Sequence, residues 1–287
     1  MTFGERLKAV MGGSLGLLFS NIVVALRIAW PWVLLAFFVS LFSPAEPVRL
    51  ESSALSNRQV LLSVLGAVAM GVIYIIAFCS VAVAWHRHGL LGEMPKSFPV
   101  RFARRELRFL GKSILVGLVM LLIMVPVVAV VVLLAALSRN GDWFSLLLFG
   151  LVGLVGYFAV VALAMRYSLV LPATAVDRDF GVADAFRHGE GFGLVMAITN
   201  VVIALLVMVL SLLLQFGLAA LAALYLTVAP AALAPTVGAF VTVVAVFFST
   251  VTSFFTMFSG LAVVTTGYRV AGESRGYDIY GNRIEKL

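Results

Sequence analysis

Long apolar runs separated by short polar segments organise this chain. Each run is long enough, or nearly so, to cross the hydrocarbon core of a bilayer as a helix. Barrel strands would alternate apolar and polar residues, and these runs do not alternate. Because backbone groups in lipid must be satisfied internally, helices are expected. The pattern predicts an all-α membrane protein, one polytopic domain over residues 1–287 with six transmembrane helices, at residues 28–43, 60–84, 113–137, 143–165, 203–226 and 237–265.

Composition agrees with a membrane location. The 287 residues are 63% hydrophobic and only 11% charged, which is too few charges to cover a soluble surface of this size. The formal net charge is +7. In a membrane protein such an excess reports orientation and attraction to anionic lipid, so we expect no nucleic-acid partner.

The distribution of Lys and Arg predicts the orientation. If the N-terminus is inside, sixteen of the 20 basic residues fall in inner segments and three in outer loops, with Arg27 inside the first apolar region. Cytoplasmic segments carry the excess of positive charge in membrane proteins. We therefore expect both termini in the cytoplasm.

Three amphipathic segments precede the pairs of spans, at residues 3–21, 98–112 and 180–200. They suggest three repeats of an interfacial helix followed by a transmembrane hairpin, over residues 1–95, 96–178 and 179–270, with a polar tail at 271–287. The alternative is convergence on sequence features common to membrane proteins.

A basic stripe marks the second amphipathic segment. Its members follow the spacing i, i+3, i+4, i+7, i+11, which places them on one helical face: Arg101, Arg104, Arg105, Arg108 and Lys112. We expect this face, with Arg87 beside Trp85 at the end of the second span, to contact anionic headgroups. The alternative is that the stripe only enforces orientation.

Glu106 falls on the apolar side of the same segment. A buried carboxylate needs a partner. Arg27 and Arg166 are expected at a similar depth, so the sequence predicts an ion pair between Glu106 and one of these arginines. The alternative is a proton-carrying carboxylate.

The sixth predicted span carries small hydroxyl residues along one face, at Ser249, Thr252, Ser253 and Thr256. Such residues let helices approach closely and form hydrogen bonds with each other. The stripe therefore predicts either a packing face or a polar path for a solute.

The histidines raise the question of a metal site. His86 and His88 point about 200° apart on a regular helix, and His188 lies in another inner segment. The three could build a zinc site with an acid only if the fold brought them together. The acids of the third segment, which include Asp177 and Glu190, are expected to form a solvated loop and a helix start, with a magnesium site as the alternative. No spacing demands a metal, a cofactor or a catalytic centre, so we expect none.

Three stretches carry a family resemblance: residues 166–191, 84-AWHRHGLLGE-93 and 101-RFARRELRFL-110. Together they resemble uncharacterised bacterial inner-membrane proteins of the YciC-like family and the membrane domain attached to some glycerophosphoryl diester phosphodiesterases. The resemblance implies a six-helix inner-membrane protein. It does not imply phosphodiesterase activity, because no polar segment here is long enough to form the catalytic domain.

The sequence leaves three functions open. The first is a non-enzymatic scaffold or accessory module that binds anionic lipid or a protein partner at its cytoplasmic face. The second is a transporter for a small or lipidic solute, with its path along the hydroxyl stripe. The third is a lipid-modifying enzyme that uses the inner histidines and acids.

Overall fold

The computed structural model describes residues 1–42, 57–96, 102–137, 143–228 and 234–284, which are almost entirely helical. The helices in chain order are α1 (Phe3–Ser20), α2 (Ile22–Phe42), α3 (Asn57–Leu91), α4 (Arg104–Leu137), α5 (Trp143–Ser168), α6 (Val170–Ala175), α7 (Val182–His188), α8 (Gly193–Val228) and α9 (Ala234–Glu273). Six of them, α2, α3, α4, α5, α8 and α9, are long and apolar enough to cross a membrane. The predicted all-α class with six spanning helices is confirmed.

The helices extend past the predicted spans at their polar ends. Helix α3 runs 35 residues to Leu91, and α9 runs 40 residues to Glu273. Helix α2 begins at Ile22, so the first span includes part of the apolar stretch before it. Hydropathy locates the lipid-facing part of a helix, whereas the helix itself continues until a glycine or a turn ends it. Gly92, with φ of 67°, ends α3 in this way.

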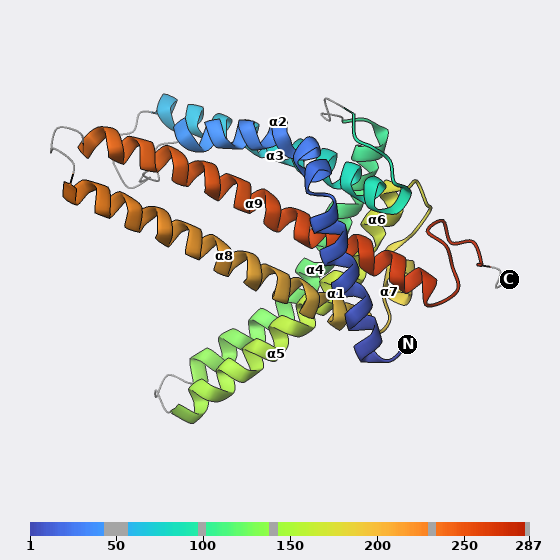
Figure 1. Cartoon of the computed structure of the whole chain (residues 1–287). Helices are drawn as coiled ribbons and strands as arrows, with labels where there is room; N and C mark the ends of the chain where they lie inside the picture. Colours follow the sequence, from blue (N-terminus) through green and yellow to red (C-terminus); the bar gives the residue numbers. More distant parts are fainter. Residues whose placement is uncertain (43–56, 97–101, 138–142, 229–233, 285–287) are drawn as a thin grey trace.

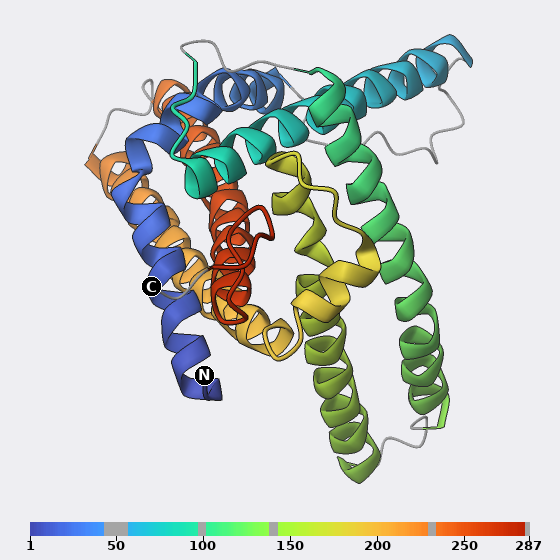
Figure 2. The same ribbon diagram turned by 90° about the vertical axis from the view of Figure 1, so that its right-hand side faces the viewer.

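The spanning helices project from one packed end as three consecutive pairs, α2–α3, α4–α5 and α8–α9 (Figures 1 and 2). The pairs α4–α5 and α8–α9 lie side by side as hairpins, whereas α2 and α3 diverge in Figure 2. Both chain termini, α6 and α7 lie at the opposite end from the hairpin tips, at the right of Figure 1. We use the name "terminal end" for the part that contains both chain termini, α6, α7 and the polar ends of α3, α4, α5 and α9.

The packed core lies at the terminal end. Trp85, Phe109, Phe192 and Tyr268 are among the largest fully buried side chains. By contrast, none of the most apolar stretch of α4 or of α5 is buried in the protein. These helices expose leucine and valine to lipid, which solvates such side chains as well as another helix would. The tertiary packing that fixes the helices relative to one another is therefore concentrated where the polar segments meet.

The three amphipathic segments differ in conformation. Helix α1 is separate from α2 and buries Val10, Ser14 and Leu18, packing against α8 and α9. Residues 104–112 instead form the first turns of α4, because no residue there breaks the helix, so a separate interfacial helix at 98–112 is wrong for its described part. Residues 180–200 divide between α7 and the start of α8. The threefold repeat stays a prediction.

Candidate functional site

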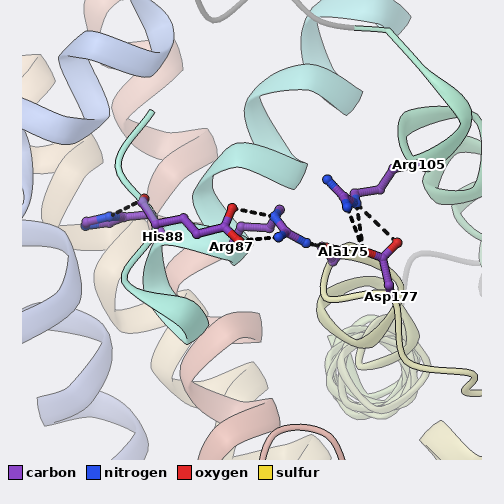
Figure 3. Close-up of polar contacts among 6 residues, drawn as sticks. Arg87, His88, Arg105, Ala175 and Asp177 are labelled. Atoms are coloured by element: carbon purple, nitrogen blue, oxygen red, sulfur yellow. Dashed lines mark hydrogen bonds and ion pairs between the residues drawn. The ribbon is translucent and has the colours of Figure 1, made fainter. Parts of the chain in front are cut away.

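A network of charged side chains joins α3, α4 and the turn after α6 (Figure 3). Its centre is Asp177, whose φ of 60° lies in the left-handed region that aspartate tolerates better than most residues. Arg105 donates to both carboxylate oxygens, with Nη2 at 2.6 Å from Oδ2 and Nε at 3.1 Å from Oδ1. Nη1 of Arg87 lies 3.4 Å from Oδ2, and Nη1 of Arg108 lies 3.9 Å from Oδ1.

Arg87 connects this centre to the end of its own helix. Its guanidinium donates to both carboxylate oxygens of Glu93, and its Nη1 donates to the carbonyl oxygen of Ala175 at 2.9 Å. The Ala175 carbonyl ends α6, where a cation is favoured by the helix dipole. Only 16% of the Arg87 side chain is exposed. Arg87 therefore holds α3 to α6, a contact that the sequence interpretation of a snorkelling arginine did not include.

The arginines keep the two carboxylates of the network charged. The hydrogen bond from Arg105, followed by the positive charges of Arg105, Arg87 and Arg108, holds the pKa of Asp177 below its ordinary value. The hydrogen bond from Arg87 lowers the pKa of Glu93 in the same way. The network is therefore an ionised cross-link at neutral pH, with no carboxyl poised to carry a proton.

Some side chains of the basic stripe contact other parts of the protein, and others are exposed. Arg105 and Arg108 contact Asp177, and Nζ of Lys112 donates to the carbonyl oxygen of Phe180 at 3.3 Å. Arg104 is exposed, as is Arg108, of whose side chain 66% is accessible. Arg101 lies outside the described residues. Part of the positive charge on the face predicted to bind headgroups thus contacts residues 175–180 of the protein itself. Binding of lipid by this face stays a prediction.

Glu106 is buried, as its position on the apolar side predicted. Its Oε2 accepts a hydrogen bond of 2.8 Å from the backbone N–H of Ala103, so the carboxylate caps the start of its own helix. Arg166 donates to the carbonyl oxygen of Phe186 and lies over the Phe186 ring, with Cζ 3.8 Å from the centroid. The predicted pair of Glu106 with Arg166 is not among the ion pairs of the described residues. A contact with Arg27 stays a prediction.

The three histidines lie in separate environments. Nδ1 of His86 lies 2.8 Å from Oγ1 of Thr265, and the Thr265 hydroxyl donates to the Leu261 carbonyl, so the imidazole is the donor to Thr265. His88 instead meets the side-chain oxygen of Asn21 at 2.9 Å, as expected for residues on different faces of α3. Trp85 is fully buried against Phe258, so its side chain does not face the surroundings of the protein.

His188 packs beside the C-terminal segment. Its ring lies between Phe180 and Tyr268, with centroids 5.5 and 5.6 Å away. The Tyr268 hydroxyl accepts from Arg178 and donates to the carbonyl oxygen of Ile279, at 2.7 and 2.8 Å, which holds residues 276–284 against α9. Burial, aided by the nearby charges of Arg275 and Arg178, lowers the pKa of His188 to about 4.

No group of three His, Cys, Asp or Glu residues that could hold a metal ion occurs among the described residues. The acids considered for magnesium have other positions. Asp177 belongs to the arginine network, and Asp184 accepts from the backbone N–H of Gly181 at 2.9 Å, which caps α7. The geometry therefore gives Asp177 and Asp184 structural contacts.

The hydroxyl stripe of α9 turns mostly outward. Ser249, Ser253 and Thr256 are exposed, and Thr252 is half-buried. Ser253 and Thr256 donate to carbonyl oxygens of their own helix at 2.9 Å. A pocket of about 440 Å³ lies beside the start of the stripe, between α2, α8 and α9, with Ser40, Gln215, Ser249 and Thr250 among its lining residues. Thr252 and Thr256 do not line it, so only the first residue of the stripe meets this space.

Several polar contacts of the terminal end were missed from the sequence. Arg275 donates to the carbonyl oxygens of Arg187 and His188 at the end of α7 and to that of Glu190 in the following turn, and Arg6 donates to that of Gly191. The one local signal is the Gly-Glu-Gly stretch that follows His188, which predicts a turn with accessible carbonyl groups. Nothing in the sequence indicates which distant arginine reaches them.

The fold and this site define a class, an α-helical integral membrane protein with six spanning helices whose polar groups are tied together at the terminal end. Comparisons with protein-family models, with curated proteins and with solved structures give no match. The functional arguments therefore depend on the geometry of this chain.

Proposed function

We propose that this protein is a non-enzymatic scaffold or accessory module of the bacterial inner membrane, with both termini in the cytoplasm, that binds anionic lipid or a protein partner at the terminal end. The observation that carries the proposal is the division of the basic stripe. Arg105 serves the internal network, while Arg104 and the outer part of Arg108 remain exposed at the polar end of a spanning helix. The resemblance to the YciC-like family, itself part of the proposal, supports the inner-membrane location.

The architecture supports a structural role in a second way. The packed terminal end carries hairpins whose apolar surfaces are largely open to lipid. Such surfaces leave room for other membrane helices. At the terminal end, each cation near an anionic membrane surface contributes about 1 kcal/mol of attraction. A terminal end that attracts anionic lipid, with hairpins that remain free to pack, fits an accessory module.

The lipid shell tests the proposal. The wild type and the double variant Arg104→Gln/Arg108→Gln would be extracted with their surrounding bilayer into polymer-bounded nanodiscs, and the ratio of phosphatidylglycerol to phosphatidylethanolamine would be measured. We expect lower phosphatidylglycerol enrichment in the double variant. Lys8→Gln, which removes one exposed cation from α1, is the control for charge alone. Equal enrichment in wild type and double variant would refute the role of the stripe.

Transport is the second candidate because of the pocket between α2, α8 and α9. Gln215, Ser249 and Thr250 give it polar groups within the predicted spanning region. A path for a polar solute would need water at this depth. In a Cys79→Ala background, a cysteine at Ser249 would react with a water-soluble maleimide from one side of the membrane if the pocket is hydrated. A cysteine at Leu213, which is exposed away from the pocket, is the matched lipid-facing control.

A further inference from the structure

Three arginines from distant parts of the chain converge on the turn between α7 and α8. We call them the turn arginines: Arg6 of α1, Arg166 of α5, and Arg275, which follows α9. Arg6 donates to the carbonyl oxygen of Gly191 at 3.3 Å, and Arg275 donates to that of Glu190 at 3.1 Å. Arg166 donates to the carbonyl oxygen of Phe186, in α7 just before the turn. The end of α7 and the turn, residues 186–191, therefore bring three positive charges onto one short segment.

The turn arginines lack the carboxylate partners that the Asp177 network has. None of the three makes an ion pair within 4.0 Å in the described part of the chain, and their partners are carbonyl groups and aromatic rings. A carbonyl oxygen satisfies an N–H group but carries no net charge. Burial, and then repulsion by Arg6 and Arg166, lower the pKa of Arg275, and only Glu190 opposes them. The cluster is therefore short of negative charge.

Glycine lets the guanidinium groups come this close to the backbone. Gly191 has φ of 75°, and a Cβ atom there would collide with Nη1 of Arg6. A Cβ at Gly193 would lie 2.6 Å from Cγ of Arg166. The Nε groups of Arg6 and Arg166 are buried and have no hydrogen-bond partner among the described residues. Two charged donors thus remain unsatisfied beside Gly191 and Gly193, which carry no side chains.

The cluster lies at the polar ends of two spanning helices, where lipid headgroups are expected. Arg166 belongs to the last turn of α5, and α8 begins at Gly193, so both spanning helices reach their polar ends here. Cζ of Arg6 lies 5.2 Å from the centroid of the Phe192 ring, and Arg166 stacks on Phe186. Arginine above aromatic rings at the end of a spanning helix is the usual chemistry of the bilayer interface. Arg275 is exposed, which opens the cluster to the outside.

We propose that the turn arginines form a discrete site for the phosphate of one anionic lipid headgroup. Planar guanidinium groups donate paired hydrogen bonds to phosphate oxygens, and a phosphate would supply the charge that the turn carbonyls lack. The site rests on the proposed lipid-binding function but differs from the exposed stripe, because it holds one molecule through three converging cations. The other source of the same chemistry is free inorganic phosphate.

Native mass spectrometry of the full-length protein in a neutral detergent tests the site. Wild type would be titrated with phosphatidylglycerol, phosphatidylcholine or inorganic phosphate. We expect one saturable phosphatidylglycerol molecule, weaker binding at higher salt, and no saturable adduct with phosphatidylcholine. Binding of phosphatidylglycerol as a non-saturating series would overturn the proposal. Saturable inorganic phosphate that displaces the lipid would overturn the lipid as ligand and assign a soluble anion.

Variants separate this site from the stripe. Arg6→Gln removes one cation while leaving the carbonyl contacts of Arg275 in place, and we expect about tenfold weaker binding of phosphatidylglycerol, the effect of one lost charged hydrogen bond. Arg6→Lys, which keeps the charge, should recover part of the affinity. Arg104→Gln removes an exposed cation elsewhere and should leave the single lipid bound. Equal affinity in wild type and Arg6→Gln would overturn the site. Unchanged bulk enrichment in Arg104→Gln/Arg108→Gln, with the single lipid still lost in Arg6→Gln, would count against the stripe alone.

Discussion

Replacing Asp177 with asparagine should loosen the contact between α3, α4 and the turn after α6. The substitution removes the negative charge that faces Arg105, Arg87 and Arg108, and asparagine keeps the tolerance of left-handed backbone that this position requires. Two positive side chains, Arg105 and Arg108, then lose their carboxylate, while Arg87 keeps Glu93. The variant therefore tests the effect of the negative charge while the backbone conformation is kept.

The expected cost is about 1–2 kcal/mol. An exposed ion pair contributes about 0.2–1 kcal/mol, whereas a hydrogen bond to a charged group contributes about 1.5–3 kcal/mol when shielded. Asp177 lies between these cases, because 41% of its side chain is exposed and Arg105 donates to both oxygens. Asp177→Ala should cost about 1 kcal/mol more, since alanine resists the left-handed conformation.

Reversible unfolding in mixed detergent micelles would measure the free energy, and hydrogen exchange would show whether residues 84–96 and 170–180 lose protection together. Asp179→Asn is the matched control, because Asp179 is an exposed acid two residues away. Since the pKa of Asp177 is lowered on folding, its stabilisation is complete above the ordinary aspartate pKa and is lost as the pH falls through the folded value. An Asp177→Asn protein as stable as Asp179→Asn would refute the cross-link.

Three further predictions concern the terminal end. Tyr268→Phe removes the hydroxyl that joins Arg178 to the Ile279 carbonyl, so residues 276–284 should exchange amide hydrogens faster, at a cost of about 1–2 kcal/mol. The pKa of His188 falls from 6.5 to about 4 on folding, so the stability of the protein is unaffected by this group above pH 6.5 and decreases as the pH falls towards 4, by at most about 3 kcal/mol. His188→Gln should flatten this part of the stability–pH curve. Gly193→Ala should cost about 1–3 kcal/mol in micelle unfolding, because its Cβ would lie 2.5 Å from the Ala162 carbonyl oxygen of α5, whereas Gly12→Ala meets open space and should not destabilise.

The spanning helices were predictable because lipid imposes a local rule. Each span must supply its own run of apolar residues, so hydropathy along the chain locates all six without knowledge of their neighbours. The helix ends were less predictable, as the extension of α3 to Leu91 shows. Helix α3 continues until the helix breaker Gly92, and the change from apolar to polar residues does not mark this position.

The polar contacts could not be predicted in the same way. Arg105 and Asp177 are 72 residues apart in the sequence, and Arg6 and Gly191 are 185 residues apart. Helical periodicity correctly placed Glu106 on the buried side. It did not predict the hydrogen bond from the N–H of Ala103, three residues away, although a carboxylate in the first turn of a helix meets unsatisfied backbone donors.

Neighbouring arginines on one helical face can have opposite roles, and the distinction depends on where a carboxylate lies in three dimensions. Arg104 and Arg105 follow each other at the start of α4, yet only Arg105 reaches Asp177. The turn arginines show the converse case, because three cations meet and none forms an ion pair with an acid among the described residues. Positive charge at the terminal end therefore divides into a neutralised part, which holds α3, α4 and α6 together, and an unneutralised part. The orientation of a protein in the membrane depends only on its total positive charge, whereas specific binding of an anion depends on the positive charge that no carboxylate neutralises. The turn arginines are therefore a stronger candidate site than the longer basic stripe.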